Sequence, residues 1–213
     1  PIYGTPAVAD GRVYIGSRDD QMYCLDASNG TKIWNYTTGG DIEGSPTVID
    51  GKVYFGSADR NVYCLDAATG SWIWNYTTDG WVRASPTVAD DKVYVATYYP
   101  GKTLYCLSAT DGSEIWSQSQ EATSFSTPVV AAGKVYISVY YYNLVKQFDA
   151  ATGDLVWAWT QPGGSSKEQA IESDIAYADG RIFFGSFDNH LYCLAATNGT
   201  QISSYLAGDK VHS

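Results

Sequence analysis

The chain has 213 residues, including 18 Tyr, 7 Trp, 6 Phe and 21 Gly, and its formal net charge is −10. This length fits one domain with a sizeable core, and the abundance of aromatic residues and glycine favours strands and tight turns over helices. The negative charge argues against nucleic acid and against an anionic membrane surface, because both require basic patches. No apolar run approaches the roughly 20 residues of a membrane span, so we expect no direct membrane insertion.

One unit recurs along the chain. Residues 4–8, 44–48 and 84–88 are near copies, and their proline recurs at position 128, with Ile175 in its place in the last copy. A glycine followed by tryptophan four residues later occurs at 30/34, 70/74, 112/116 and 153/157, whereas Ser203 follows Gly199. The prolines and Ile175 are spaced by 40, 40, 42 and 47 residues, which indicates five copies.

Each copy reads as four short strands. In the second copy the expected strands are residues 46–49, 52–57, 61–65 and 71–77, separated by turn residues. The Asp-Gly pair at 50–51 is a two-residue hairpin signal, and 66–70 is a longer turn that an aspartate side chain can close. A radially repeated four-stranded unit of this length predicts an all-β fold, a β-propeller of five four-stranded blades. We expect a single domain over 1–213, with blades at about 1–40, 41–80, 81–122, 123–164 and 165–213.

The two ends of the chain leave ring closure open. Residues 209–213 align with 41–45, the lead-in to another copy, and 1–4 have the same phase, as in an arc of a larger propeller. The fifth copy, however, has Ser203 and Ala195 in place of the usual tryptophan and turn aspartate, and atypical repeats usually mark an end. We therefore expect a five-bladed unit, with a five-blade arc of a seven- or eight-bladed propeller as the alternative.

Residues 24–34 resemble a known repeat. They look like the pattern Ala-Leu-Asp-Ala-x-Thr-Gly-x-x-x-Trp of pyrroloquinoline-quinone-like repeats, with Cys in the first position and Asn29 in place of Thr. Residues 64–74 are closer still, and 149–157 keep the later half of the pattern. The resemblance covers all five copies. It implies a propeller in which each tryptophan docks one blade on the next, in a family that includes quinoprotein dehydrogenases, the outer-membrane assembly scaffold and cell-surface proteins.

The sequence does not point to an active site. Cys24, Cys64, Cys106 and Cys193 occupy one position in four copies, so symmetry separates them and we expect free, buried thiols. The quinoprotein dehydrogenases of the family that this chain resembles have eight blades and a pair of adjacent cysteines. This chain has no two adjacent cysteines. We expect no metal, no cofactor and no catalysis. A quinoprotein-like enzyme or a hydrolase with its site in the channel mouth is the alternative.

Candidate binding residues come from the parts that are not repeated. The loops between the second and third strands of copies three and four are longer and rich in tyrosine, and the residues three before the repeated proline should ring the channel mouth. Exposed aromatic residues clustered on one face mark binding surfaces; alternatively, these tyrosines fill seams between blades. The expected partner-binding residues are Tyr98, Tyr99, Tyr140, Tyr141 and Tyr142 on the loops, and Arg83, Phe125 and Glu172 at the mouth.

Four asparagines match the N-glycosylation pattern: Asn29, Asn35, Asn75 and Asn198. Together with the acidic composition, they favour an extracellular or cell-surface glycoprotein, with a periplasmic location as the alternative. We expect a binding or scaffolding propeller whose aromatic loop face contacts a protein or a glycan. A structural repeat unit of a surface layer or filament, which would self-associate, is the other reading.

Overall fold

The computed structural model describes residues 1–120, 126–163, 170–171 and 173–211. The described part forms five antiparallel sheets, each with four strands that pair in chain order. The strands are β1 (Ala7–Ala9), β2 (Arg12–Gly16), β3 (Gln21–Asp26), β4 (Lys32–Thr37), β5 (Thr47–Ile49), β6 (Lys52–Gly56), β7 (Asn61–Asp66), β8 (Trp72–Thr77), β9 (Thr87–Ala89), β10 (Lys92–Ala96), β11 (Thr103–Ser108), β12 (Glu114–Ser119), β13 (Val129–Ala131), β14 (Lys134–Val139), β15 (Leu144–Asp149), β16 (Leu155–Thr160), β17 (Ala176–Ala178), β18 (Arg181–Gly185), β19 (His190–Ala195) and β20 (Gln201–Leu206). The predicted all-β fold with five four-stranded blades is confirmed.

Turn chemistry fixes the strand ends. Asp50 and Gly51 both have positive φ, 49° and 71°, which lets two residues join β5 to β6. In the turn after β7, the Asp66 side chain accepts hydrogen bonds from the amides of Ala68 and Thr69, at 3.0 and 2.8 Å. The aspartate side chain therefore closes the turn, as predicted.

The core consists of the seams between neighbouring blades. At the first seam, Met22, Cys24 and Trp34 of the first blade pack with Phe55 and Leu65 of the second, and all five are buried. The four cysteines are free and buried, which confirms the prediction made from their spacing. Because side chains alternate along a strand, successive residues point in turn toward the preceding blade and toward the following blade.

The tryptophans dock the blades on one another. Trp34, Trp74, Trp116 and Trp157 each donate an indole N–H to a backbone carbonyl of the next blade, at 3.1, 3.3, 3.2 and 3.1 Å, the acceptors being Ala67, Ala109, Ala150 and Ala196. The first three are buried and Trp157 is half-buried. This confirms the docking role that the family resemblance implied.

The repeated glycine of a blade packs against the docking tryptophan of the preceding blade. A Cβ on Gly112 would lie 2.6 Å from the Trp74 ring, and Gly70, Gly153 and Gly199 meet Trp34, Trp116 and Trp157 in the same way. These glycines have φ near +70°, and a Cβ on any of them would overlap an indole. Gly30, in the first blade, has nothing within 4 Å of its Cβ position.

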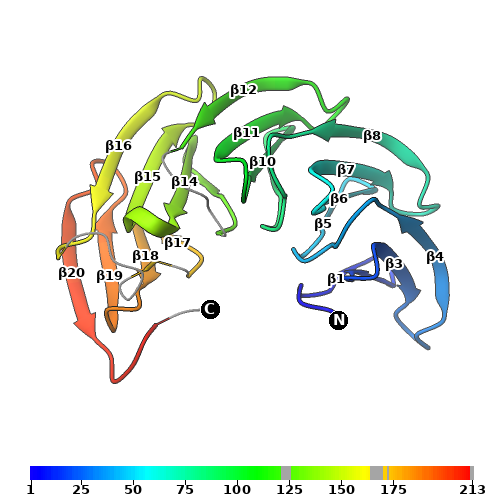
Figure 1. Ribbon diagram of the computed structural model, residues 1–213, viewed down its shortest axis with the longest axis horizontal. Helices are drawn as coiled ribbons and strands as arrows, with labels where there is room; N and C mark the ends of the chain where they lie inside the picture. Colours follow the sequence, from blue (N-terminus) through cyan, green and yellow to red (C-terminus); the bar gives the residue numbers. More distant parts are fainter. Residues whose placement is uncertain (121–125, 164–169, 172, 212–213) are drawn as a thin grey trace.

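The five blades stand in an open arc. Figure 1 shows the first blade, β1 to β4, apart from the fifth, β17 to β20, with the innermost strands around the centre. The outermost strand β20 is exposed along its whole length, and Tyr205 is 71% exposed. The described structure thus leaves the outer face of the fifth blade uncovered.

Candidate binding surface at the channel mouth

The segments that lead into the innermost strands surround a cavity of about 540 Å³ at the centre of the arc. It is lined by Tyr3, Gly4, Thr5, Glu43, Gly44, Ser45, Arg83, Ala84, Ser85, Thr127 and Asp174. All of these residues precede the first strand of their blade. The lining therefore comes from the lead-in segments of the blades and not from the packed seams.

A collar of polar side chains ties the lead-in segments together. Ser45 accepts a hydrogen bond from the Thr5 amide at 2.8 Å, and Ser85 accepts one from the Ser45 amide at 2.9 Å. Asp174, at the equivalent place in the fifth blade, accepts one from the Thr127 amide at 2.9 Å. These bonds hold neighbouring lead-in segments against one another, which lowers the entropic cost of binding there.

Ion pairs run across the mouth from the first blade to the third. Glu43 lies between two guanidinium groups, 3.3 Å from Arg18 Nε and 3.1 Å from Arg83 Nε. Arg18 also donates to Asp41 at 2.6 Å, and this hydrogen bond raises the pKa of Arg18 above its ordinary value. The pairs are partly exposed, so they orient the side chains more than they stabilise the fold.

Beside the mouth, Trp81, Arg83, Tyr98 and Tyr99 form a group that we call the Trp81 cluster. The Arg83 guanidinium carbon lies 4.6 Å from the ring centroid of Trp81 and 5.3 Å from that of Tyr98, as in cation–π contacts. The Trp81 ring contacts both tyrosines, with centroids 6.2 and 5.9 Å apart. The backbones are also joined, because the Tyr98 amide donates to the Trp81 carbonyl at 2.7 Å.

The cluster combines a fixed base with an exposed tip. Trp81, Arg83 and Tyr98 are half-buried, whereas Tyr99 is 62% exposed. Rigid aromatic side chains next to a guanidinium are the composition of protein-binding hot spots. The cluster can therefore offer a large, preformed contact area at low entropic cost.

The structure places the predicted site residues in different settings. Arg83 lines the mouth, and Tyr98 and Tyr99 belong to the Trp81 cluster. In the fourth blade, the short 3-10 helix Tyr140–Tyr142 carries a half-buried Tyr140 and an exposed Tyr142. Phe125, Glu172 and the side chain of Tyr141 lie outside the described part of the chain. Partner binding by these residues stays a prediction.

Trp81 is the residue that sequence reasoning missed. It stands where the second blade has Asp41, since the amide of Tyr98 binds the Trp81 carbonyl just as that of Ala58 binds the Asp41 carbonyl. The signal for it is in the sequence, because Pro1, Asp41, Thr123 and Ala170 stand where the third copy has Trp81.

The glycosylation candidates all lie on the surface. Asn35 and Asn75 donate their amide groups to Gln21 and Asn61, at 2.7 and 3.2 Å. Asn29 and Asn198 are exposed and cap the amides of Thr31 and Thr200, at 2.9 and 3.0 Å. Each asparagine thus has a local structural role, and its modification stays a prediction.

The described residues lack a metal-ligand cluster and a membrane-spanning helix. They contain no group of three or more His, Cys, Asp or Glu side chains that could hold a metal ion. They contain no helix long and apolar enough to cross a membrane.

The five repeated sheets, docked by tryptophans around a polar mouth, define a propeller of pyrroloquinoline-quinone-like repeats. A family model described as outer membrane protein assembly factor BamB matches residues 1–205, and the chain belongs to this family.

Solved structures share the fold at low sequence identity. BamB from Moraxella catarrhalis superposes with a TM-score of 0.81 and 19% identity, over 99% of this chain and 65% of that one. The quinohemoprotein alcohol dehydrogenase from Comamonas testosteroni gives 0.85 and 18%, over 97% of this chain and 43% of that one. The chain thus spans less than two thirds of the length of either protein.

Curated relatives match a short stretch only. The dehydrogenase subunit of the quinone alcohol dehydrogenase from Gluconacetobacter polyoxogenes is 32% identical over 68 residues, and that from Komagataeibacter europaeus is 35% identical over 68 residues. In both cases the match covers 30% of this chain and 9% of the relative.

Proposed function

We propose that this propeller is a non-catalytic scaffold that binds a protein partner through the Trp81 cluster and the adjoining channel mouth. The observation that carries the proposal is the cluster itself, an exposed Tyr99 held on a half-buried Trp81 and Arg83. The family description supports it, because that description names a protein assembly factor. We further propose that the scaffold works on the periplasmic side of an outer membrane, in place of the extracellular site expected first.

Tyr99 gives the sharpest test, because its exposed side chain adds little to folding. A photo-crosslinking residue at position 99 in the complete protein should capture a partner in the cell envelope, which mass spectrometry then identifies. With the purified partner, Tyr99→Ala should weaken binding at least about tenfold, or roughly 1.4 kcal/mol. Calorimetry measures the affinity, and the melting temperature should stay within about 2 °C of the parent, as for other surface changes.

Trp72 supplies the matched control. It is an exposed aromatic residue on β8, away from the mouth, so Trp72→Ala should leave the affinity unchanged. Equal losses for the two variants would show that the Trp81 cluster is not the binding surface. A glycan array run on the same proteins tests the other partner class, since tyrosine rings also stack on sugar faces.

An enzyme remains the second candidate, because the curated relatives are quinone-dependent dehydrogenase subunits. The residues here do not supply the adjacent cysteine pair of those enzymes, since each of the four cysteines is buried in a different blade. Dye-linked alcohol oxidation after addition of pyrroloquinoline quinone and Ca²⁺ tests this candidate, and turnover above background would favour it over the scaffold.

A further inference from the structure

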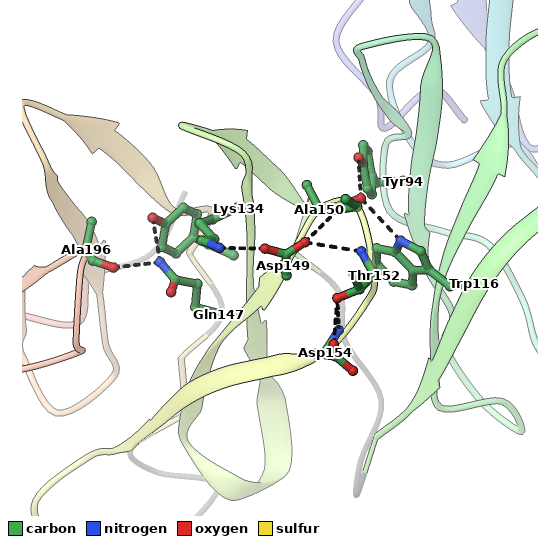
Figure 2. Close-up of polar contacts among 11 residues, drawn as sticks. Tyr94, Trp116, Lys134, Gln147, Asp149, Ala150, Thr152, Asp154 and Ala196 are labelled. Atoms are coloured by element: carbon green, nitrogen blue, oxygen red, sulfur yellow. Dashed lines mark hydrogen bonds and ion pairs between the residues drawn. The ribbon is translucent and has the colours of Figure 1, made fainter.

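Each seam is a joint between two neighbouring blades, and the first three joints share one hydrogen-bond pattern. The hydroxyls of Tyr14, Tyr54 and Tyr94 donate to the carbonyls of Ala67, Ala109 and Ala150, at 3.0, 3.2 and 3.2 Å. The docking indoles donate to the same carbonyls, as Figure 2 shows for Tyr94, Trp116 and Ala150. A cysteine lies opposite each of these tyrosines on the next strand, and its small side chain leaves the tyrosine hydroxyl free to reach the carbonyl.

The joint between the fourth and fifth blades breaks this rule. Gln147 stands in the cysteine position, opposite Tyr136. Its side-chain nitrogen donates to the Tyr136 hydroxyl at 2.8 Å. The same nitrogen donates to the Ala196 carbonyl at 2.6 Å (Figure 2). The amide has therefore replaced the tyrosine as the donor to the next blade.

Because of this exchange, two groups have unused hydrogen-bonding capacity among the described residues: Gln147 Oε1 and the Tyr136 hydroxyl. Gln147 is only 2% exposed, and its Oε1 is buried and accepts no hydrogen bond from any described residue. The Tyr136 hydroxyl accepts from Gln147, so its own proton is available to a further acceptor. Buried polar groups in proteins are nearly always satisfied, and an orphan acceptor beside a spare donor calls for a molecule that supplies both partners.

Tyr136 and Gln147 are among the residues that line a cavity of about 250 Å³ at this joint. Its walls include the rings of Tyr136 and Tyr177, whose centroids are 5.9 Å apart, and the side chains of Val156 and Ala132. A cavity of about 150 Å³ accommodates a benzene ring, so one ring with a substituent fits here.

The cavity presents no net charge. Lys134 lines it, but its ammonium group is paired with Asp149 Oδ2 at 2.6 Å (Figure 2). Ala132 stands in the β13–β14 turn, where the corresponding turns of the other blades have aspartates, such as Asp50. The occupant that matches these walls is therefore uncharged.

The second joint offers an internal comparison. Its cavity, about 350 Å³, lies at the equivalent place but is lined by Asp50, Asp90 and Asp91. Tyr54 lines it too, and the Tyr54 hydroxyl is already satisfied by Ala109. The two leftover groups are thus a property of the fourth joint.

We propose that the cavity between the fourth and fifth blades binds an uncharged single-ring molecule that carries a hydroxyl group, of the size of a phenol. The ligand hydroxyl donates to Gln147 Oε1 and accepts the proton of Tyr136. Its ring packs against Tyr177 and Val156. This site is separate from the channel mouth and does not depend on the scaffold function.

Phenol itself is the probe. Titrated into the isotopically labelled protein, phenol should shift the side-chain amide signal of Gln147, with a dissociation constant in the millimolar range or below. Gln147→Cys restores the residue of the other blades and should weaken binding at least about tenfold, because the hydroxyl loses its acceptor. Benzene, which lacks the hydroxyl, should bind the parent about tenfold more weakly than phenol.

Two further variants make the result decisive. Tyr54→Phe at the second joint is the matched control and should leave phenol binding unchanged; the fifth blade already has Phe183 at this position. Tyr177→Val, which copies Val88 of the other cavity, should also weaken binding if Gln147→Cys does not fold. Absence of phenol binding at millimolar concentration would mean that water alone satisfies Gln147. That result, or equal binding by Gln147→Cys, would overturn the proposal.

Discussion

At the scale of single residues, Asp149 shows how one charged side chain serves two joints. Its carboxylate accepts a hydrogen bond from Lys134 at 2.6 Å (Figure 2). It also accepts one from the Ala151 amide at 2.9 Å, so it closes the turn after β15. The same turn carries the Ala150 carbonyl that receives Tyr94 and Trp116 from the third blade. The ion pair with Lys134 therefore supports the geometry of the third joint and keeps the cavity at the fourth joint neutral.

Asp149 should make stability depend on pH in acid. The hydrogen bond from Lys134, followed by those from the turn amides, lowers the pKa of Asp149 from 3.8 to about 2. A carboxyl with a lowered pKa stabilises the fold above its ordinary pKa, and this contribution is lost as the pH falls through the folded value. We expect Asp149→Asn to reduce the dependence of the unfolding free energy on pH between about pH 4 and pH 2, as measured by urea unfolding.

Asp179 provides the comparison for this measurement. It lies in the exposed turn between β17 and β18, and Asn tolerates its positive φ. Asp179→Asn removes the same formal charge and therefore controls for the change in net charge. Equal effects of the two substitutions would mean that Lys134 does not hold Asp149 in solution.

At the scale of the elements, the repeated glycines separate two physical effects, the strain of a left-handed backbone and close packing against a tryptophan. Gly30 and Gly112 both have φ near +73°, but only Gly112 lies against a tryptophan, Trp74 of the preceding blade. Alanine at either position incurs the strain of a left-handed backbone, about 1–2 kcal/mol. Alanine at 112 must in addition displace an indole in a packed seam, for about 1–3 kcal/mol more.

We therefore expect Gly112→Ala to destabilise the protein by about 1–3 kcal/mol more than Gly30→Ala. Denaturant unfolding of the two variants, monitored by circular dichroism, measures the difference. The fluorescence of Trp74 should also change in Gly112→Ala, because its ring must move. If the two variants lose the same stability, the seam is soft enough to absorb a methyl group and packing does not explain the repeated glycine.

The strands could be predicted from the sequence almost to the residue. In the second blade the expected 52–57 and 61–65 correspond to Lys52–Gly56 and Asn61–Asp66. Hairpin and turn residues delimit these strands locally, so a single copy suffices to place them. The partner of the glycine could not be predicted, because Gly112 packs on Trp74, which lies in the preceding copy, and not on Trp116, the tryptophan four residues after it.

The candidate sites were predicted less completely, for a related reason. Comparison of the copies identified Arg83, Tyr98 and Tyr99, since each departs from its counterparts in a loop. It did not single out Trp81 or Gln147, whose importance depends on contacts made across blades, with Tyr99 and with Ala196. A departure from the repeat can be recognised in the sequence. Which contacts it makes across the blades, and which polar groups it leaves without a partner, can be seen only in the three-dimensional structure of the joint.

At the scale of the whole molecule, the arc gives each blade a different share of the core. The second, third and fourth blades are packed on both faces, whereas the first and fifth are each packed on one (Figure 1). The fifth blade also lacks both donors of a standard joint, having Phe183 and Ser203 in the tyrosine and tryptophan positions. In repeat proteins, stability is approximately the sum of the blade and joint contributions, so it should decline toward this end.

We therefore expect amide hydrogen exchange to begin at β20. Its side chains are all exposed, and β19 pairs with it on one edge only, so local opening of β20 uncovers little apolar surface. Mass spectrometry of peptides that cover β19–β20 and β7–β8 should show exchange in the first pair at least about tenfold faster, for a difference of roughly 1.4 kcal/mol in opening free energy. Measurements at two protein concentrations control for self-association, which would cover the outer face and slow the exchange of β20 at the higher concentration. If β19–β20 and β7–β8 exchange alike at both concentrations, the five blades open as one cooperative unit, and the uncovered face does not weaken the fifth blade.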